Sequence, residues 1–152
     1  MTPCPIAIML DGRRRTYAPG EMLSGEYRWD ADPGSQVKAV EVSVLWYTEG
    51  KGDEDFGVHF FDRLSVEEGD EVGPRQCARF STQLPKSPLS YEGVIVKIRW
   101  CVRVRLFLKR GKVFTRERTF QLGHVPPARP LVTPAARRNL RLKVRPEADE
   151  FG

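Results

Sequence analysis

Residues 91–109 read YEGVIVKIRWCVRVRLFLK, and this stretch decides the fold class. Every even position from Val94 to Leu108 is apolar, whereas Lys or Arg occupies four of the odd positions between them. A period of two places successive side chains on opposite faces of a β-strand. The stretch therefore predicts one long strand with an apolar face toward a core and a largely basic face toward solvent. Because most strands are only ~17–20 Å long, we expect a bulge or a bend within it.

Shorter segments of the same kind lie on both sides of this stretch. Residues 40–46 alternate in the same way, and Gly, Pro and acidic turns separate the other apolar segments. Strands joined by turns therefore fit the chain better than helices. Within 56–66 we expect one shared face for Val58, Phe60, Leu64 and Val66. The chain should form about seven strands, at residues 6–10, 22–29, 40–46, 56–66, 76–84, 91–109 and 113–122.

Strands of this number, with a turn roughly every ten to twenty residues, predict an all-β fold, an immunoglobulin-like sandwich of two antiparallel sheets. A chain of 152 residues is long enough to build one hydrophobic core. We expect residues 1–122 to form that single domain. Residues 123–152 are expected to lie outside it, as a proline-rich linker followed by a basic tail.

The tail has a pattern of its own. Residues 129–145 carry six Lys or Arg and no acid, whereas the first 128 residues are close to neutral. Within this segment apolar and basic side chains alternate, in the order Leu140, Arg141, Leu142, Lys143, Val144 and Arg145. Such a segment can add a strand to an exposed sheet edge, in its own domain or in a second copy of the chain. The segment is therefore a candidate for strand addition, and truncation after Gly123 tests this hypothesis.

Two segments resemble the N-terminal domain of arrestins and α-arrestins. Residues 17–27, YAPGEMLSGEY, resemble the family pattern Y-x-x-G-[ED]-x-[VL]-S-G-x-[VY]. Residues 84–93, LPKSPLSYEG, resemble L-P-x-S-x-x-S-[FY]-x-G, and the IRW of residues 98–100 resembles the aromatic-containing strand that follows it. Both motifs occur in the family's order, with room for the intervening strands.

The resemblance covers residues 6–122 and implies an arrestin-type sandwich. It also implies the kind of function that is common in that family, namely protein–protein scaffolding without catalysis. No segment of this sequence matches the charged polar core or the phosphate-sensing lysines of the visual and β-arrestins. The resemblance therefore assigns no site residue here.

The sequence nominates no catalytic residue, metal ligand or cofactor. His59 and His124 are far apart in the chain, and neither stands at ligand spacing from a Cys, Asp or Glu. The three cysteines, Cys4, Cys77 and Cys101, form no C-x-x-C pair. An odd number of cysteines, with no signal-peptide order and no apolar stretch of transmembrane length, predicts a cytoplasmic location.

The basic face of the long strand is a candidate binding surface, formed by Lys97, Arg99, Arg103 and Arg105. Cations on a sheet can bind the phosphates of nucleic acid, phospholipid or a phosphorylated peptide. They can equally form a solvated face balanced by acids on adjacent strands, such as Glu41 and Glu117. Charge reversal at Arg103 and Arg105 separates the two interpretations, because only the first predicts a loss of anion binding in a folded protein.

Taken together, these patterns predict a non-catalytic adaptor or scaffold that binds a protein partner through sheet edges and loops. Self-association through a sheet edge or the tail is a second expectation. The alternative is an anion- or nucleic-acid-binding module that uses the basic face and the tail. Nucleic acid is the less favoured partner, because the charge of +5 resides mainly in the tail and not over the whole domain.

Overall fold

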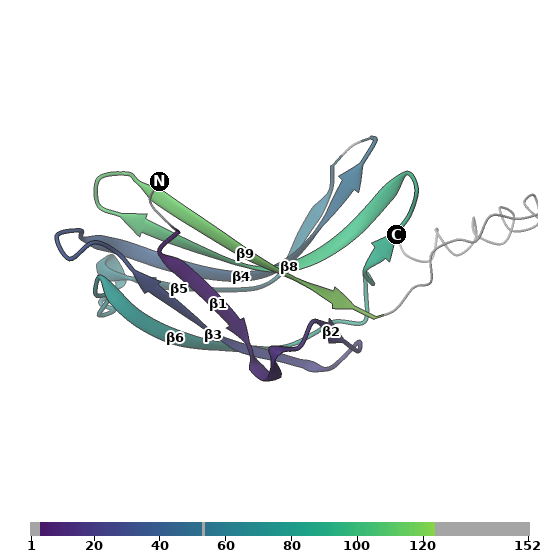
Figure 1. Cartoon of the computed structure of the whole chain (residues 1–152), viewed down its shortest axis with the longest axis horizontal. Coiled ribbons are helices and arrows are strands. Elements are labelled where there is room, and N and C mark those ends of the chain that lie inside the picture. Colours follow the sequence, from purple (N-terminus) through teal and green to yellow (C-terminus); the bar gives the residue numbers. More distant parts are fainter. Residues whose placement is uncertain (1–3, 53, 124–152) are drawn as a thin grey trace, which may run out of the picture.

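The computed structural model describes residues 4–52 and 54–123, which form two β-sheets (Figure 1). The three-stranded sheet has the order β1-β3-β6, with β1 (Ile6–Leu10), β3 (Met22–Asp30) and β6 (Arg75–Gln83). The six-stranded sheet has the order β2-β9-β8-β4-β5, and β7 also pairs with β8. Its strands are β2 (Thr16–Tyr17), β4 (Val37–Gly50), β5 (Phe56–Ser65), β7 (Tyr91–Glu92), β8 (Val96–Leu108) and β9 (Val113–Leu122).

Two short 3₁₀ turns, η1 (Asp11–Arg13) and η2 (Val66–Glu68), complete the regular structure of the described residues. The β2–β9 pair is parallel, and every other strand pair in the described chain is antiparallel. The predicted all-β, two-sheet sandwich is therefore confirmed. No helix in residues 4–52 and 54–123 has the length and apolar character needed to cross a membrane.

The core lies between the two sheets, which stack face to face in Figure 1. As predicted, the even positions of β8 from Trp100 to Leu108 point into it, and Trp100, Val102, Val104 and Leu106 are fully buried. The even positions Val96 and Ile98, at the start of β8, are only partly buried and lie outside the core cluster. Alternate residues of the neighbouring strand β4 lie on the same face of the large sheet, namely Val40, Val42 and Val44. Residues of the small sheet fill the other side of the core, namely Leu23, Tyr27, Trp29 and Phe80. The apolar residues recur with a period of two because one face of each sheet is buried in the core.

The prediction of one strand over residues 91–109 is wrong at its start. The chain forms β7, turns, and then pairs β8 back against β7, with Tyr91 opposite Ile98. Gly93 permits this turn, because a Cβ there would lie 2.6 Å from the Val96 carbonyl oxygen. The irregularity expected in this stretch is thus a tight turn, and Val94 and Ile95 are exposed at its tip instead of buried in the core.

Other boundaries differ from the predictions by a few residues. Strand β4 extends beyond the predicted 40–46 at both ends, and β5 ends one residue earlier than predicted. Figure 1 shows the β4–β5 hairpin and the β7–β8 turn projecting beyond the small sheet. The two-residue strands β2 and β7 were not expected, because two residues are too few to display a period. Of the predicted linker and tail, 123–152, the structure describes Gly123, and residues 124–152 lie outside the described residues.

Candidate interaction surface

The four predicted cations, Lys97, Arg99, Arg103 and Arg105, all lie on β8 and point away from the core. Arg99 binds two carboxylates, each at 3.1 Å, from Glu49 and Glu92. The hydrogen bond to Glu49 raises the pKa of the Arg99 guanidinium. Lys97 lies 3.6 Å from Glu92. The first half of the basic face is therefore neutralised by acids of β4 and β7.

The second half of the basic face is partly neutralised. Arg103 binds Glu117 of β9 at 2.5 Å, one of the two acids expected to balance the face. Glu41, the other expected acid, stands opposite Arg105 but forms its ion pair with Arg63 of β5. Among the residues that the structure describes, Arg105 is the one of the four cations without an ion pair. Anion binding by this face stays a prediction, with Arg105 as its most available cation.

Strand β5 lies at the edge of the large sheet and contains a β-bulge. Val44 of β4 stands opposite Phe60, but Leu45 stands opposite Val58, so His59 is an extra residue. The His59 ring reaches the small sheet, where its Nε2 lies 2.6 Å from the Gln83 carbonyl oxygen of β6. An extra residue reverses the alternation of a strand. The bulge therefore sets which side chains of β5 face outward.

Three apolar side chains of β5 face outward as a result of the bulge. Phe56, Val58 and Phe61 are 69%, 54% and 54% exposed, and we call them the β5 patch. The prediction that Val58 and Val66 share an inner face with Phe60 and Leu64 is wrong: Phe60 and Leu64 pack on the core, whereas Val58 and Val66 are exposed. Val66 lies beyond the end of β5, as the first residue of η2.

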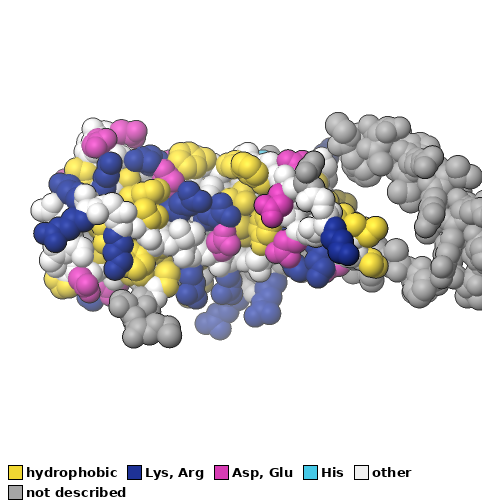
Figure 2. All heavy atoms as spheres, turned by 90° about the horizontal axis from the view of Figure 1, so that it is seen from above, with side chains coloured by type: hydrophobic (Ala, Val, Ile, Leu, Met, Phe, Trp, Pro, Cys, Tyr) yellow, Lys and Arg dark blue, Asp and Glu magenta, His cyan; other side chains and the backbone are white. Residues whose placement is uncertain are grey.

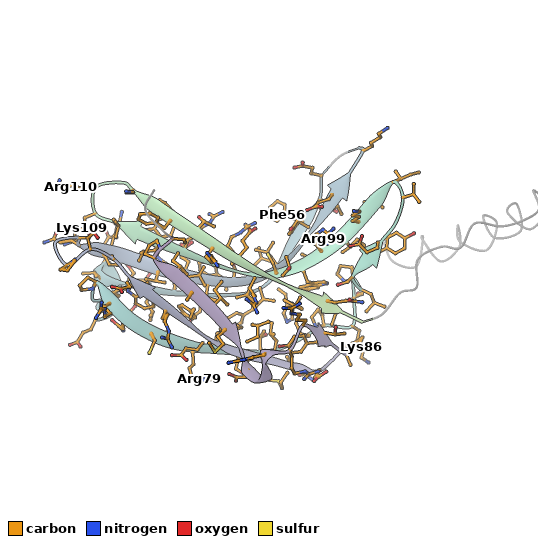
Figure 3. The ribbon with its side chains drawn as sticks, viewed as in Figure 1. Phe56, Arg79, Lys86, Arg99, Lys109 and Arg110 are labelled. Atoms are coloured by element: carbon orange, nitrogen blue, oxygen red, sulfur yellow. The ribbon has the colours of Figure 1, made fainter. Side chains whose placement is uncertain are left out.

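The β5 patch continues onto the outer face of β4. Phe56 and Arg99 both stand opposite Tyr47, one on each side of it (Figure 3). Tyr47 and Leu45 line an open groove with Phe56 and the acids Glu49, Glu54 and Asp55. Seen from above the large sheet, hydrophobic side chains lie next to the Lys and Arg side chains and are interspersed with acids (Figure 2). The surface is thus apolar at the β5 edge and ionic toward β8.

Sequence reasoning missed the β5 patch, although one signal was present. Phe60 and Phe61 are adjacent, and adjacent residues of a strand point to opposite faces. One of the two rings therefore had to lie outside the core in any register. Which one depends on the bulge at His59, which no turn residue or proline marks in the sequence.

Within residues 4–52 and 54–123 no three His, Cys, Asp or Glu side chains lie close enough together to hold a metal ion. His59 is engaged with β6, and its ring also meets the Trp100 ring edge-on, with 6.2 Å between the ring centres. His124 lies outside the described residues. So does the candidate strand-adding segment, Leu140, Arg141, Leu142, Lys143 and Val144.

The three cysteines differ in their environment, and this gives a first testable prediction. Cys4 and Cys77 are free and exposed, whereas Cys101 is free and fully buried, and burial raises the pKa of its thiol to about 12. Because the thiolate is the reacting form, Ellman's reagent should titrate two thiols rapidly in the native protein at pH 8. The third should react only after denaturant is added. Three rapid equivalents would contradict the position of Cys101.

Comparison of the sequence with protein-family models finds no match, and none of the curated proteins matches either. Among solved structures, the chain is similar to Spo0M, a sporulation control protein from Bacillus subtilis. The similarity has a TM-score of 0.60 at 14% sequence identity and covers 83% of this chain. It covers 51% of Spo0M, so the chain spans about half the length of that protein. Spo0M has an arrestin-like fold, and at the level of the fold the resemblance read from the two motifs is confirmed.

Proposed function

We propose that this chain is a non-catalytic, cytoplasmic interaction module that binds a partner protein at the β5 edge of its large sheet. The observation that carries the proposal is the β5 patch, because Phe56, Val58 and Phe61 are exposed on one strand. Single exposed apolar residues are ordinary, but neighbouring ones bordered by polar groups are typical of protein-binding surfaces. Aromatic residues are also enriched where interfaces are buried.

The position of the β5 patch supports the proposal further. Strand β5 pairs only with β4 in the described chain, so its other backbone edge is open to a partner. Extended segments bind such edges through main-chain hydrogen bonds, and side-chain contacts provide the specificity. The resemblance to arrestins, a family of scaffolds without catalysis, supports the same class of function. The three free cysteines are consistent with the reducing environment of the proposed cytoplasmic location.

The alternative, an anion- or nucleic-acid-binding module, has weaker support. Lys97, Arg99 and Arg103 already hold carboxylates at 3.6 Å or less, and a phosphate would have to displace them. Phosphate contacts also weaken steeply with salt. Binding through the β5 patch should instead persist at high salt, because it rests on burial of apolar surface.

A second prediction tests the proposed function through capture of partner proteins. The chain truncated after Gly123, which keeps every residue that the structure describes, is immobilised and compared with its double variant Phe56→Ser/Phe61→Ser, and bound proteins are identified by mass spectrometry at low and at high salt. The matched control is Val113→Ser, because Val113 is 46% exposed on β9 and is paired with Phe107, away from the β5 edge. We expect the double variant to lose a set of proteins that the wild type and the control both retain at high salt. An identical set on all three proteins would refute the proposal.

A further inference from the structure

We propose that the basic tail of this chain adds to the open edge of β5 in the same molecule, as a further strand formed by residues 140–145. The inference rests on the proposed function only in that it uses the same strand. The proposed occupant of the edge is the tail of the same chain, which the edge would recognise through apolar and ionic contacts. Four features of the described residues and of the sequence carry it.

The first feature is the match of apolar side chains. In a strand paired with β5, every second side chain lies on the outer face, about 4.5–5.5 Å from its neighbour across the pair. Residues 140, 142 and 144 are Leu, Leu and Val. They have the spacing needed to lie side by side on that face, next to the exposed side chains of the β5 patch. Pairing would remove apolar surface of both strands from water.

The second feature is charge. With Leu140 and Leu142 outward, the cations between and after them face the inner side of the sheet. Asp62 lies on that side of β5, because it stands opposite the fully buried Val42. The Asp62 carboxylate accepts a backbone hydrogen bond from Arg63, but no Lys or Arg side chain of residues 4–52 and 54–123 forms an ion pair with it. The inward-facing Asp62 carboxylate could therefore form an ion pair with a Lys or Arg side chain of a strand that pairs with β5.

Acids also flank β5 at both ends. Glu54 and Asp55 precede the strand, and the acidic group of residues 67–71 follows it. The tail carries six Lys or Arg in residues 129–145 with no acid among them. Opposite charges opposite each other on paired strands stabilise the pair. The cations of the tail therefore complement the acids at the two ends of β5.

The third feature is selectivity. A bulge and an inward-pointing charge are two devices by which proteins keep an edge strand from pairing with arbitrary strands. Strand β5 has both, in His59 and Asp62. An apolar strand would bury the Asp62 carboxylate without a partner, which is costly. A strand with Arg141 and Lys143 on the inner side avoids that cost, so the edge selects for an alternating apolar and basic segment.

The fourth feature is reach. The described chain ends at Gly123, just after β9, and three strand spacings separate β9 from β5 in the sheet order. Each spacing is about 4.8 Å. The intervening chain from Gly123 to Leu140 can span up to roughly 56 Å when extended. A tether of this length supplies a high effective concentration of the tail at its own edge.

A fluorescently labelled peptide of residues 137–146 tests the inference. The probe is titrated into the chain truncated after Gly123 and into the full chain, and fluorescence anisotropy is measured. The truncated chain should bind the peptide. The full chain should bind it at least about tenfold more weakly, because its tethered tail occupies the edge. Equal binding by the two proteins, or none by either, would overturn the inference.

A charge swap makes the test specific to the edge. Asp62→Lys in the truncated chain should abolish binding of the wild-type peptide, and a peptide with Arg141→Glu and Lys143→Glu should bind that variant instead. The matched control is Glu26→Lys on β3, because Glu26 belongs to the small sheet and pairs with Arg28. This control should bind the wild-type peptide normally. Failure of the swapped peptide to bind the Asp62→Lys variant, while circular dichroism shows a folded protein, would also overturn the inference.

Measurement of the molecular mass in solution shows whether the tail pairs with β5 of its own molecule or with β5 of a second copy. The full chain should be a monomer, and a dimer that dissociates on removal of the tail would show pairing between copies and overturn the intramolecular proposal. The proposed function fails independently. Partner capture depends on Phe56 and Phe61 and can be measured with the truncated chain, whereas peptide binding needs no partner protein.

Discussion

Replacement of Trp100 by alanine is expected to lower the free energy of unfolding by about 3–5 kcal/mol. Trp100 is fully buried at the centre of β8, and its ring lies 5.9 Å from that of Phe120 between the ring centres. Its indole N–H donates a 2.7 Å hydrogen bond to the Pro88 carbonyl oxygen, so the substitution also leaves that acceptor without its partner. Urea unfolding followed by circular dichroism measures the loss.

The control for this substitution is Phe56→Ala on β5. Phe56 is also aromatic but lies mostly in solvent, so its removal should change the free energy of unfolding by no more than about 0.5 kcal/mol. The comparison separates a ring that builds the core from a ring that we assign to binding. If Trp100→Ala were as stable as Phe56→Ala, the position of the core between β8 and the small sheet would be wrong.

The strands were predictable from sequence wherever one face is buried along their length. In β8 and β4 alternate residues are buried, so apolar and polar residues alternate in the sequence with a period of two. The bounds of β1 and β9 were predicted as observed. The errors arise where the backbone departs from that period. Gly93 reverses the chain although the apolar alternation continues through Val94, because the exposed tip of the turn is also apolar.

The candidate site was predictable only in part, for a related reason. The outward direction of Lys97, Arg99, Arg103 and Arg105 follows from alternation alone. Their ion pairs do not, because they depend on which strand lies next to β8 and in which register. Glu117 was foreseen as a partner from the neighbouring strand β9, whereas Glu49 and Glu92 became partners through the extension of β4 and the turn before β8. Pairing across strands is a tertiary property.

Gly25 gives the last prediction, and it explains a residue of the first arrestin-like motif. Gly25 lies in β3, between Leu10 of β1 and Phe80 of β6. A Cβ at this position would lie 2.7 Å from the Met9 carbonyl oxygen and 3.0 Å from the Phe80 ring. The oxygen belongs to the backbone of a paired strand and cannot move without disturbing the sheet. Gly25→Val should therefore lower the free energy of unfolding by about 3 kcal/mol or more.

The matched control is Gly34→Val, because a Cβ at Gly34 would meet no atom within 4 Å. That variant should unfold within about 0.5 kcal/mol of the wild type. Thermal unfolding of the two variants side by side measures the difference, and we expect a transition roughly 10 °C or more lower for Gly25→Val alone. If the two variants melted together, close packing of the three strands would not be the reason for glycine at this position of the motif. If they separate as expected, the S-G element of the motif marks the place where β1, β3 and β6 approach too closely for any side chain.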